Sequence, residues 1–357
     1  MKKTTPLNKL IHQLIKIEPD SSPLISCFVN IDHPRSNYFT ELELRSQHFL
    51  NQFSGKRRDD FQDALAEVRE YLEKSLKPES KSVAIYCRWG ESPTFVAHQF
   101  QVPMETALIV DDLPHIYPLV ELKDTYRRFV IVLTNENEAQ IMETTIGAVT
   151  EEILTQRPEI RQRVGREWTK QHYRNHKRER SAQFVREKVR VIESLMNGRG
   201  INYLILTGNP KMVGRLKRAL PNHLKSRLLD AYGAATNQGV SPILLESLQL
   251  IIAAENIESH DRVAELEQSI LSNGLGIAGY QASKDAIEGG YADVLVIDQD
   301  LEDEEMREEL VRLAAKASIE VETVRRSDRL KALSGVGCLL RYRPMPIANE
   351  TPMRAAS

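Results

Sequence analysis

The chain has 357 residues, of which 41% are apolar and 27% are charged, so it is long enough for two or three domains with ordinary hydrophobic cores. Its 48 Lys and Arg against 50 Asp and Glu give a formal net charge of -2, which excludes a uniformly basic nucleic-acid coat but not a local basic patch. The three cysteines (Cys27, Cys87 and Cys338) are far apart and form no CxxC pair, which excludes a disulfide framework and a cysteine zinc cluster and indicates a reducing cytoplasm.

The N-terminal segment predicts an amphipathic helix rather than a signal peptide. Lys2 and Lys3 are followed by apolar residues into which Asn8, His12 and Lys16 are mixed. The apolar runs of the chain are short, such as Phe129 to Leu133, whereas a membrane span needs about 18 residues. We therefore expect a cytoplasmic protein without a membrane partner.

Residues 1–125 predict an N-terminal α/β domain. A strand at Leu24–Ile31 precedes a helical hairpin, roughly Tyr38–Phe53 and Asp59–Leu76. The predicted turn of this hairpin, Ser54–Arg58, contains a helix-breaking Gly55 and then three cations. Short strands follow at Ser82–Cys87, Thr94–Phe100 and Ala107–Val110, and a Pro-rich stretch ends the domain.

Residues 126–235 predict a second domain of βαβ type. Strands are expected at Arg128–Thr134, Gln140–Thr145 and Tyr203–Leu206. A long polar stretch, Gln156–Arg180, precedes a helix whose apolar face is Val185, Val189, Ile192 and Met196. A further helix starts at Pro210, because proline suits the first turn of a helix.

Residues 236–345 predict a third domain, followed by a flexible tail at 346–357. Two helices are expected from apolar stripes, one at Leu244–Ile252 and one at Val263–Ile270. Strands at Ala292–Ile297, Ile319–Val324 and Gly337–Tyr342 and a helix at Glu302–Ala317 complete it. The whole chain is thus predicted to be α/β.

Charge is segregated along the chain. Arg157–Arg190 contains twelve Lys or Arg and four Asp or Glu, a net charge of +8, whereas Asp298–Glu309 contains eight carboxylates and Arg307 alone. Arg and Lys neutralise phosphates, and aromatic rings can stack on exposed bases. The sequence therefore predicts RNA binding by the basic segment, with no DNA-binding motif in view. The alternative is a solvated surface loop.

Three further patterns match known site motifs only in part. His172 and His176 have the spacing of a helical metal pair, but the glutamate of HExxH is absent and the surroundings are cationic. Gly274–Gly279 matches GxGxxG, but a charged helical stretch precedes it where a dinucleotide site needs a strand. Asp298, Asp300, Glu302 and Glu309 fit a calcium loop whose sixth position is Asp303 instead of Gly. We expect no metal, no cofactor and no catalytic residue.

Six stretches taken together resemble a known family. Arg127–Ala139, then Ser181–Phe184 with Tyr203–Pro210, are similar to the central domain of archaeo-eukaryotic class-1 release factors and of pelota. Asn273–Gly276, Ala292–Val296 and Ser334–Tyr342 resemble the third domain of that family, a ribosomal-protein-like α/β sandwich. The resemblance covers residues 126–343 and implies a three-domain release-factor/pelota-like architecture with mixed sheets flanked by helices.

Departures from the family pattern determine the expected function. Release factors carry Gly-Gly-Gln directly before the Ser-Ala step, and the corresponding residues here are Arg178, Glu179 and Arg180. These cannot adopt a glycine-only backbone or replace the glutamine, so no peptide release and no enzyme activity are expected. The Asn-Ile-Lys-Ser stop-codon motif is also missing from the N-terminal hairpin.

The resemblance implies a monomeric hibernation factor that occupies the vacant A site of idle 70S ribosomes together with elongation factor Tu. Its N-terminal domain would then lie towards the decoding centre, with Lys56, Arg57 and Arg58 on 16S rRNA. A pelota-like rescue factor for stalled ribosomes is the main alternative, and an RNA-processing or NAD-binding enzyme is a third. The residues expected on 23S rRNA, at the peptidyl-transferase side, are His172, Tyr173, Arg174, His176, Lys177, Arg178 and Arg180.

Overall fold

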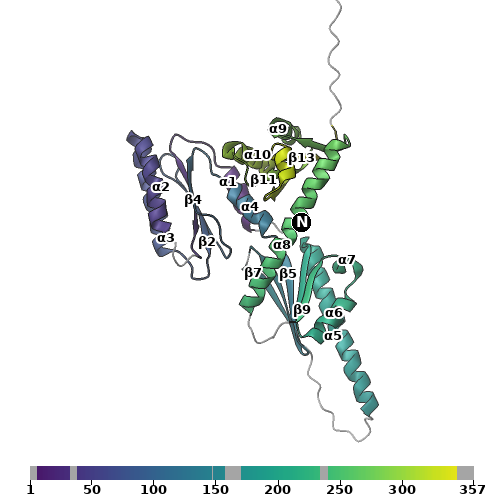
Figure 1. Ribbon diagram of the computed structural model, residues 1–357. Coiled ribbons are helices and arrows are strands. Elements are labelled where there is room, and N and C mark those ends of the chain that lie inside the picture. Colours follow the sequence, from purple (N-terminus) through teal and green to yellow (C-terminus); the bar gives the residue numbers. More distant parts are fainter. Residues whose placement is uncertain (1–5, 33–37, 147, 157–169, 234–239, 344–357) are drawn as a thin grey trace, which may run out of the picture. The chain divides into compact units, whose positions relative to one another are not determined.

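The computed structural model describes residues 6–32, 38–146, 148–156, 170–233 and 240–343. The chain divides into two compact units, Met1–Glu255 and Asn256–Ser357 (Figure 1). Each of the three expected domains contains one sheet, and helices accompany every sheet, so the α/β class is confirmed. The expected boundary at residues 235 and 236 and the expected tail at 346–357 lie outside the described residues.

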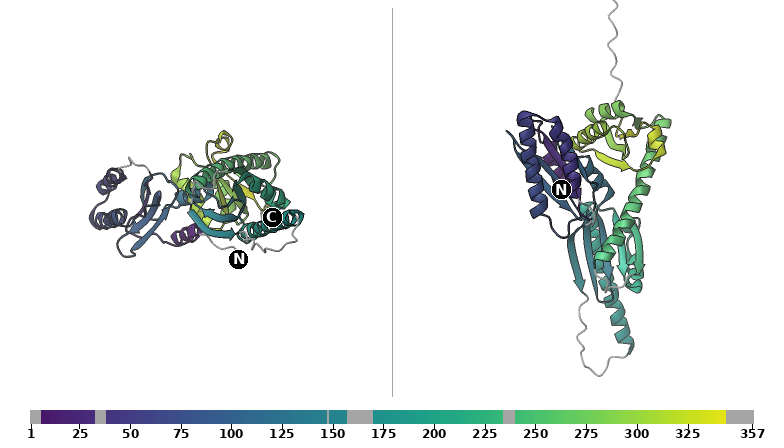
Figure 2. Two further views of the ribbon diagram at one scale, coloured as in Figure 1. Left: turned by 90° about the horizontal axis from the view of Figure 1, so that it is seen from below. Right: turned by 60° about the vertical axis from the view of Figure 1, so that its left-hand side comes forward.

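The first sheet is antiparallel, with strand order β3-β2-β1-β4. Helices α2 (Tyr38–Gln52) and α3 (Gly55–Lys74) cover one of its faces (Figure 2). Alternate residues of β1 therefore point into two different cores: Ile25, Cys27 and Val29 pack against α3, and Phe28 faces the other way, edge-on to Tyr86. The strands are β1 (Leu24–Asn30), β2 (Ser82–Arg88), β3 (Thr94–Phe100) and β4 (Ala107–Asp111).

Two further helices belong to this part of the first unit. Helix α1 (Pro6–Ile15) packs against α4 (Tyr117–Thr125), and the buried side chains of α1 confirm the predicted amphipathic N-terminal helix. The Tyr86 hydroxyl donates to the carbonyl of His115, just before α4, at 2.9 Å. Helix α4 was not predicted, because the prolines around it indicated a closing loop, whereas Pro118 occupies the first turn of α4 and is compatible with a helix there.

The second sheet mixes parallel and antiparallel strands in the order β7-β6-β5-β8-β9. Its two faces bury different residues of β5: Val130 and Val132 pack against α5 and α6, and Phe129 and Ile131 pack against α8. The result is a three-layer α/β/α sandwich. The strands are β5 (Phe129–Thr134), β6 (Glu138–Thr145), β7 (Ala148–Gln156), β8 (Tyr203–Gly208) and β9 (Leu228–Gly233); the helices are α5 (Lys170–Arg199), α6 (Pro210–Ala219), α7 (Asn222–Lys225) and α8 (Val240–Leu271).

Helix α8 continues from the first unit into the second. Ile243, Leu248 and Ile251 enter the core of the second sheet, and Val263 and Leu266 enter the core of the second unit. The two helices predicted here are therefore one, because no proline or glycine interrupts the segment between the two apolar stripes. By length and composition alone α8 could cross a membrane. One such helix is weak evidence for a membrane span, because the core helix of a soluble protein passes the same test.

The second unit is built on a sheet with strand order β10-β13-β11-β12, in which only β11 and β12 are parallel. Val294, Val296 and Val324 of this sheet pack on Val263 and Leu266 of α8. The strands are β10 (Gly276–Ala278), β11 (Ala292–Asp298), β12 (Glu320–Val324) and β13 (Val336–Leu340); the helices are α9 (Tyr280–Glu288), α10 (Glu304–Lys316) and α11 (Asp328–Ala332).

Two predicted loops are wrong where they carry the proposed RNA-binding residues. The turn Ser54–Arg58 is shorter than expected, because α3 already begins at Gly55. The predicted loop Gln156–Arg180 includes the first eleven residues of α5, from Lys170 onward. Lys, Gln and Arg are good helix formers, so the polar composition that indicated a loop is also compatible with an exposed helix.

Candidate nucleic-acid interface

Helix α5 is anchored by its C-terminal part. Phe184, Ile192 and Met196 are buried in the core beneath the second sheet. The ammonium group of Lys188 is also fully buried: it donates to the hydroxyl of Thr134 at 2.8 Å and lies 3.5 Å from the centroid of the Phe184 ring. A lysine on this face was not predicted, because its charge favoured solvent. These contacts fix α5 on the sheet at the end of β5.

An ion cluster holds the far end of the same helix. Arg199 donates to Glu143 of β6, a carboxylate that is only 3% exposed as a residue. Arg128 lies 3.7 Å from the other carboxylate oxygen and donates to the Arg199 carbonyl at 2.9 Å. Burial, and secondarily the charge of Arg199, lowers the pKa of Arg128. The helix is thus fixed at two points along its length.

The N-terminal part of α5 carries the residues predicted on 23S rRNA. Residues 170–183 precede Phe184, which is the first core residue of the helix, and span about 20 Å at 1.5 Å per residue. Figure 1 shows this end of α5 extending past the second sheet. The predicted residues all lie in this helical stretch, and their side-chain positions lie outside what the structure describes: His172, Tyr173, Arg174, His176, Lys177, Arg178 and Arg180.

The positions that correspond to Gly-Gly-Gln are helical. Arg178, Glu179 and Arg180 lie inside α5, and Glu179 is exposed to solvent. A continuous helix satisfies the backbone N–H groups within itself, so the backbone here does not adopt the conformation that only glycine allows. The local chemistry is that of a cationic helix.

The second predicted group lies in the first turn of α3. Lys56, Arg57 and Arg58 occupy a turn that contains no acidic residue, and Ser54 at the N-cap makes no side-chain hydrogen bond. Cations at a helix N-terminus oppose the helix dipole, which costs about 0.3–1 kcal/mol each at an exposed site. Such a turn is locally unfavourable and is compatible with an anionic partner.

Two of these three cations have partners of their own. Lys56 pairs with Glu91 at 3.2 Å, and Arg57 pairs with Asp112 at 3.0 Å. The guanidinium of Arg57 also donates to the Ser21 carbonyl and lies over the Phe53 ring. Exposed ion pairs contribute about 0–1 kcal/mol, so a phosphate can replace either carboxylate at little cost.

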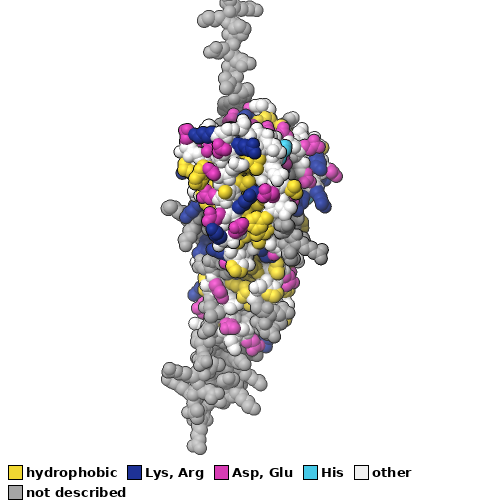
Figure 3. Space-filling view, turned by 90° about the vertical axis from the view of Figure 1, so that its left-hand side faces the viewer, with side chains coloured by type: hydrophobic (Ala, Val, Ile, Leu, Met, Phe, Trp, Pro, Cys, Tyr) yellow, Lys and Arg dark blue, Asp and Glu magenta, His cyan; other side chains and the backbone are white. Residues whose placement is uncertain are grey.

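An exposed tryptophan beside this turn was missed. Trp89 is 44% exposed in the turn between β2 and β3, which also contains Glu91, the partner of Lys56. The signal was present in the sequence as Arg88-Trp89-Gly90 between two predicted strands, but a single aromatic residue in a turn is not specific. The face that carries α2 and α3 has Lys and Arg mixed with Asp and Glu, rather than one continuous basic patch (Figure 3).

The patterns set aside in the second unit have structural explanations. Asp303 caps α10 by accepting from the Met306 N–H at 2.9 Å, and Glu304 and Glu305 fill the first turn, as a helix dipole favours. Asp298 ends strand β11 instead of opening a calcium loop after a helix. The GxGxxG segment follows helix α8, and its middle forms β10, which is antiparallel to β13. A helix therefore precedes the first glycine, where a dinucleotide site needs a strand.

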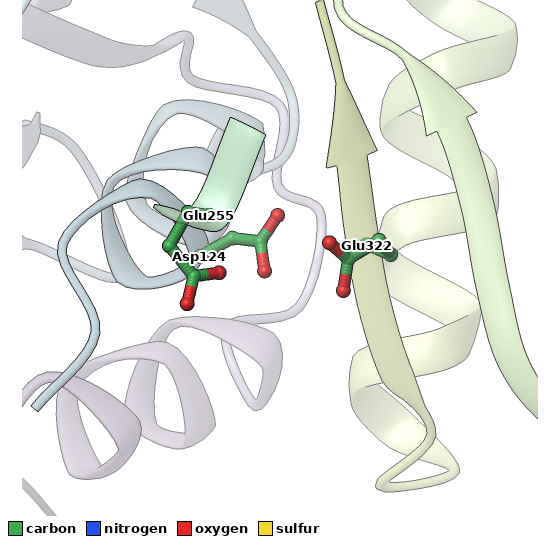
Figure 4. Close-up of side chains that lie close together, drawn as sticks. All are labelled: Asp124, Glu255 and Glu322. Carbon is green, nitrogen blue, oxygen red and sulfur yellow. The ribbon is translucent and has the colours of Figure 1, made fainter. Parts of the chain in front are cut away.

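Buried carboxylates of the first unit surround an arginine. Arg127 pairs with Asp124 of α4 at 3.1 Å and with Glu255 of α8 at 2.7 Å. Figure 4 draws these two carboxylates, together with Glu322 of strand β12 in the second unit. The guanidinium of Arg127 supplies the positive charge that the neighbouring Asp124 and Glu255 need, so this pair is explained without a metal ion.

Part of the chain is similar to a known protein family, and the chain also has distant structural relatives. Residues 114–246 match the model of bacterial archaeo-eukaryotic release factor family 10. No curated protein matches the chain. Pelota in a model of ribosome-bound archaeal Pelota and ABCE1 is 16% identical, with 96% of each chain covered and a TM-score of 0.47. Archaeoglobus fulgidus Pelota is 15% identical, with 96% of this chain and 94% of that chain covered and a TM-score of 0.39. The archaeal termination factor aRF1 is 18% identical, with 94% and 97% covered and a TM-score of 0.28.

The family match concerns one segment of the chain, residues 114–246. The segment includes the second sheet, the anchored helix α5 and the cationic stretch that precedes Phe184. It is the same part of the chain in which the sequence resembled the central domain of release factors. Residues 114–246 are therefore similar to bacterial archaeo-eukaryotic release factor family 10.

Proposed function

We propose that this protein is a ribosome hibernation factor, similar to the bacterial factor Balon. It occupies the vacant A site of idle 70S ribosomes together with elongation factor Tu and releases no peptide. The single observation that carries the proposal is helix α5: it is anchored in a family-matched domain and extends a cationic end beyond the core. A helix that is rich in Lys and Arg suits a site walled by rRNA phosphates.

The same helix supports the proposal that no peptide is released. In release factors a glutamine on a glycine backbone positions water at the peptidyl-tRNA ester, whereas here Arg178, Glu179 and Arg180 are helical. A guanidinium remains protonated at physiological pH and cannot act as a general base there. The proposed protein therefore blocks a site instead of catalysing a reaction, and it needs no metal and no cofactor.

Two surfaces are assigned to the two ribosomal subunits. The α5 residues from His172 to Arg180 would contact 23S rRNA at the peptidyl-transferase side. Lys56, Arg57 and Arg58 in the first turn of α3 would contact 16S rRNA at the decoding side. The acidic start of α10 would remain available to protein partners in the cytoplasm, among them elongation factor Tu, since rRNA repels carboxylates.

A rescue factor for stalled ribosomes is the second candidate. One similar protein, archaeal Pelota, is described as ribosome-bound together with ABCE1. Rescue and hibernation need the same lack of catalytic residues, so they differ in the state of the ribosome that is bound. A rescue factor prefers ribosomes that carry peptidyl-tRNA, whereas a hibernation factor prefers ribosomes without a nascent chain.

The test is to sediment extracts of stationary or cold-stressed cells through a sucrose gradient and to locate the protein. Hibernation predicts co-migration with intact 70S particles that lack nascent peptide. Appearance only with stalled or splitting ribosomes would favour rescue. Absence from every ribosomal fraction would refute both hibernation and rescue and would favour an enzyme with another site.

A further inference from the structure

The turn that carries Trp89 is held rigidly against the rest of the first domain. Arg88 is buried and donates to the Ser92 carbonyl at 3.3 Å and to the Glu18 carbonyl at 2.9 Å. Gly90 has φ +122°, and a Cβ at this position would lie 2.2 Å from the Ser22 hydroxyl oxygen. Only glycine fits there, so the turn sits directly on the residues beneath it.

The residues beneath the turn connect it to helix α3. The Ser22 hydroxyl donates to the buried carboxylate of Asp60 at 2.7 Å, and Asp60 lies in α3 two residues after Arg58. Lys56 in the first turn of α3 reaches Glu91 in the same turn as Trp89. The turn that carries Trp89 is therefore joined to the first turn of α3, which carries the three cations.

Trp89 stays 44% exposed while its two chain neighbours are locked in place, so its side chain is available to a partner. Because little conformational entropy remains to be lost, such a ring is preorganised for binding. An aromatic ring beside cations is the pairing that binds single-stranded nucleic acid, with stacking for the base and charge for the phosphates.

We propose that Trp89 stacks on an unpaired base of RNA, with the flanking phosphates on Lys56 and Arg58. This inference rests on the proposed ribosomal function and adds a residue and a mode of contact to it: the surface reads a single-stranded or bulged nucleotide rather than a duplex. RNA is favoured over a protein partner because Lys56 reaches the turn of Trp89 through Glu91, and because that ion pair is exposed and weak enough for a phosphate to replace it.

Intrinsic fluorescence tests the stacking directly. The chain has two tryptophans, Trp89 and Trp168, so a Trp168→Phe background reports on Trp89 alone. The probes are octamers of uridine and of adenosine, with inorganic polyphosphate as a probe of charge without bases. Both octamers should quench Trp89, and polyphosphate should not. Unchanged fluorescence with RNA, or equal quenching by polyphosphate, would overturn the inference.

Variants separate stacking from charge. In the wild-type background, Trp89→Ala should weaken octamer binding about 5- to 100-fold, the loss expected for one stacked base, without changing its salt dependence. Trp89→Phe should restore most of the affinity, which excludes misfolding as the cause. Arg58→Ala should lower the salt slope by about 0.7. Phe95→Ala, at another exposed aromatic residue of the same hairpin, is the matched control and should bind normally.

Ribosome binding distinguishes this inference from the function on which it rests. If the wild type sediments with 70S ribosomes and Trp89→Ala sediments equally well at every salt concentration, the stacking role is wrong and the proposed function stands. If the wild type does not bind ribosomes while RNA still quenches Trp89, the proposed function is wrong and the RNA surface stands.

Discussion

Removing the charge from the projecting end of α5 should weaken ribosome binding in a salt-dependent way. The perturbation is the fourfold variant Arg174→Ala, Lys177→Ala, Arg178→Ala and Arg180→Ala. Each phosphate contact contributes about 0.7–0.9 to the slope of log affinity against log salt, so the loss of four contacts lowers the slope by about 3. Between 50 and 200 mM salt, the wild type should then lose about 60-fold more affinity than the variant.

The fold should tolerate these four changes. The substituted residues precede Phe184, where the core contacts of α5 begin, and alanine is the best helix former. The free energy of unfolding, measured with urea, should therefore stay within about 1 kcal/mol of the wild-type value. A loss of binding with unchanged stability can then be attributed to the removed charges.

A matched variant on α6 controls for general electrostatics. Lys211, Arg215, Lys217 and Arg218 are exposed, carry the same total charge and belong to the same domain. Affinity for purified 70S ribosomes is measured by pelleting across a salt series. The reasoning is refuted if the α6 variant lowers the slope as much as the α5 variant, or if neither variant changes it.

Three further predictions concern stability and pH. Glu143→Gln should destabilise the fold by about 3 kcal/mol in urea unfolding, because Arg199 at the end of α5 and Arg128 just before β5 then lose their buried counter-charge. Gly208→Ala should cost about 1–3 kcal/mol by the same measurement, since φ is +115° and a Cβ would lie 2.2 Å from the carbonyl oxygen of the facing strand; an unchanged midpoint would contradict this. Hydrogen bonds from Lys284 and then Tyr280 lower the pKa of Glu309, so this group stabilises the fold above its unfolded pKa and loses that contribution as pH falls through its folded pKa. Glu309→Gln should flatten that acidic part of the stability profile, and an identical profile would show that the cluster contributes nothing.

The sequence predicted those elements whose apolar pattern is unambiguous. Strands such as Phe129–Thr134 are short runs of buried residues, and α10 has both an apolar stripe and acidic residues in its first turn. Strand β7 was missed because its sequence, Ala148–Gln156, combines polar and apolar residues at the edge of a sheet. Edge strands lack a partner on one side, so their composition resembles that of loops.

The sequence shows which residues of the candidate site are cationic, but it does not show how the fold positions them. The basic segment and the three cations of α3 are visible as composition, but no local pattern shows where the core contacts of α5 begin. That limit is set by Phe184 and by the buried Lys188, whose burial depends on Thr134, a residue 54 positions away. The role proposed for Trp89 depends on its neighbours, because Arg88 and Gly90 contact distant parts of the chain. Such long-range contacts have no local sequence signature.

The most direct test of the central claim is competition for the A site. Purified protein is mixed with vacant 70S ribosomes, with and without elongation factor Tu, and pelleted before and after the A site is filled with tRNA. The account predicts binding to vacant ribosomes, strengthened by elongation factor Tu and abolished by A-site tRNA. Binding that persists with tRNA in the A site, or no binding to vacant ribosomes, would contradict it.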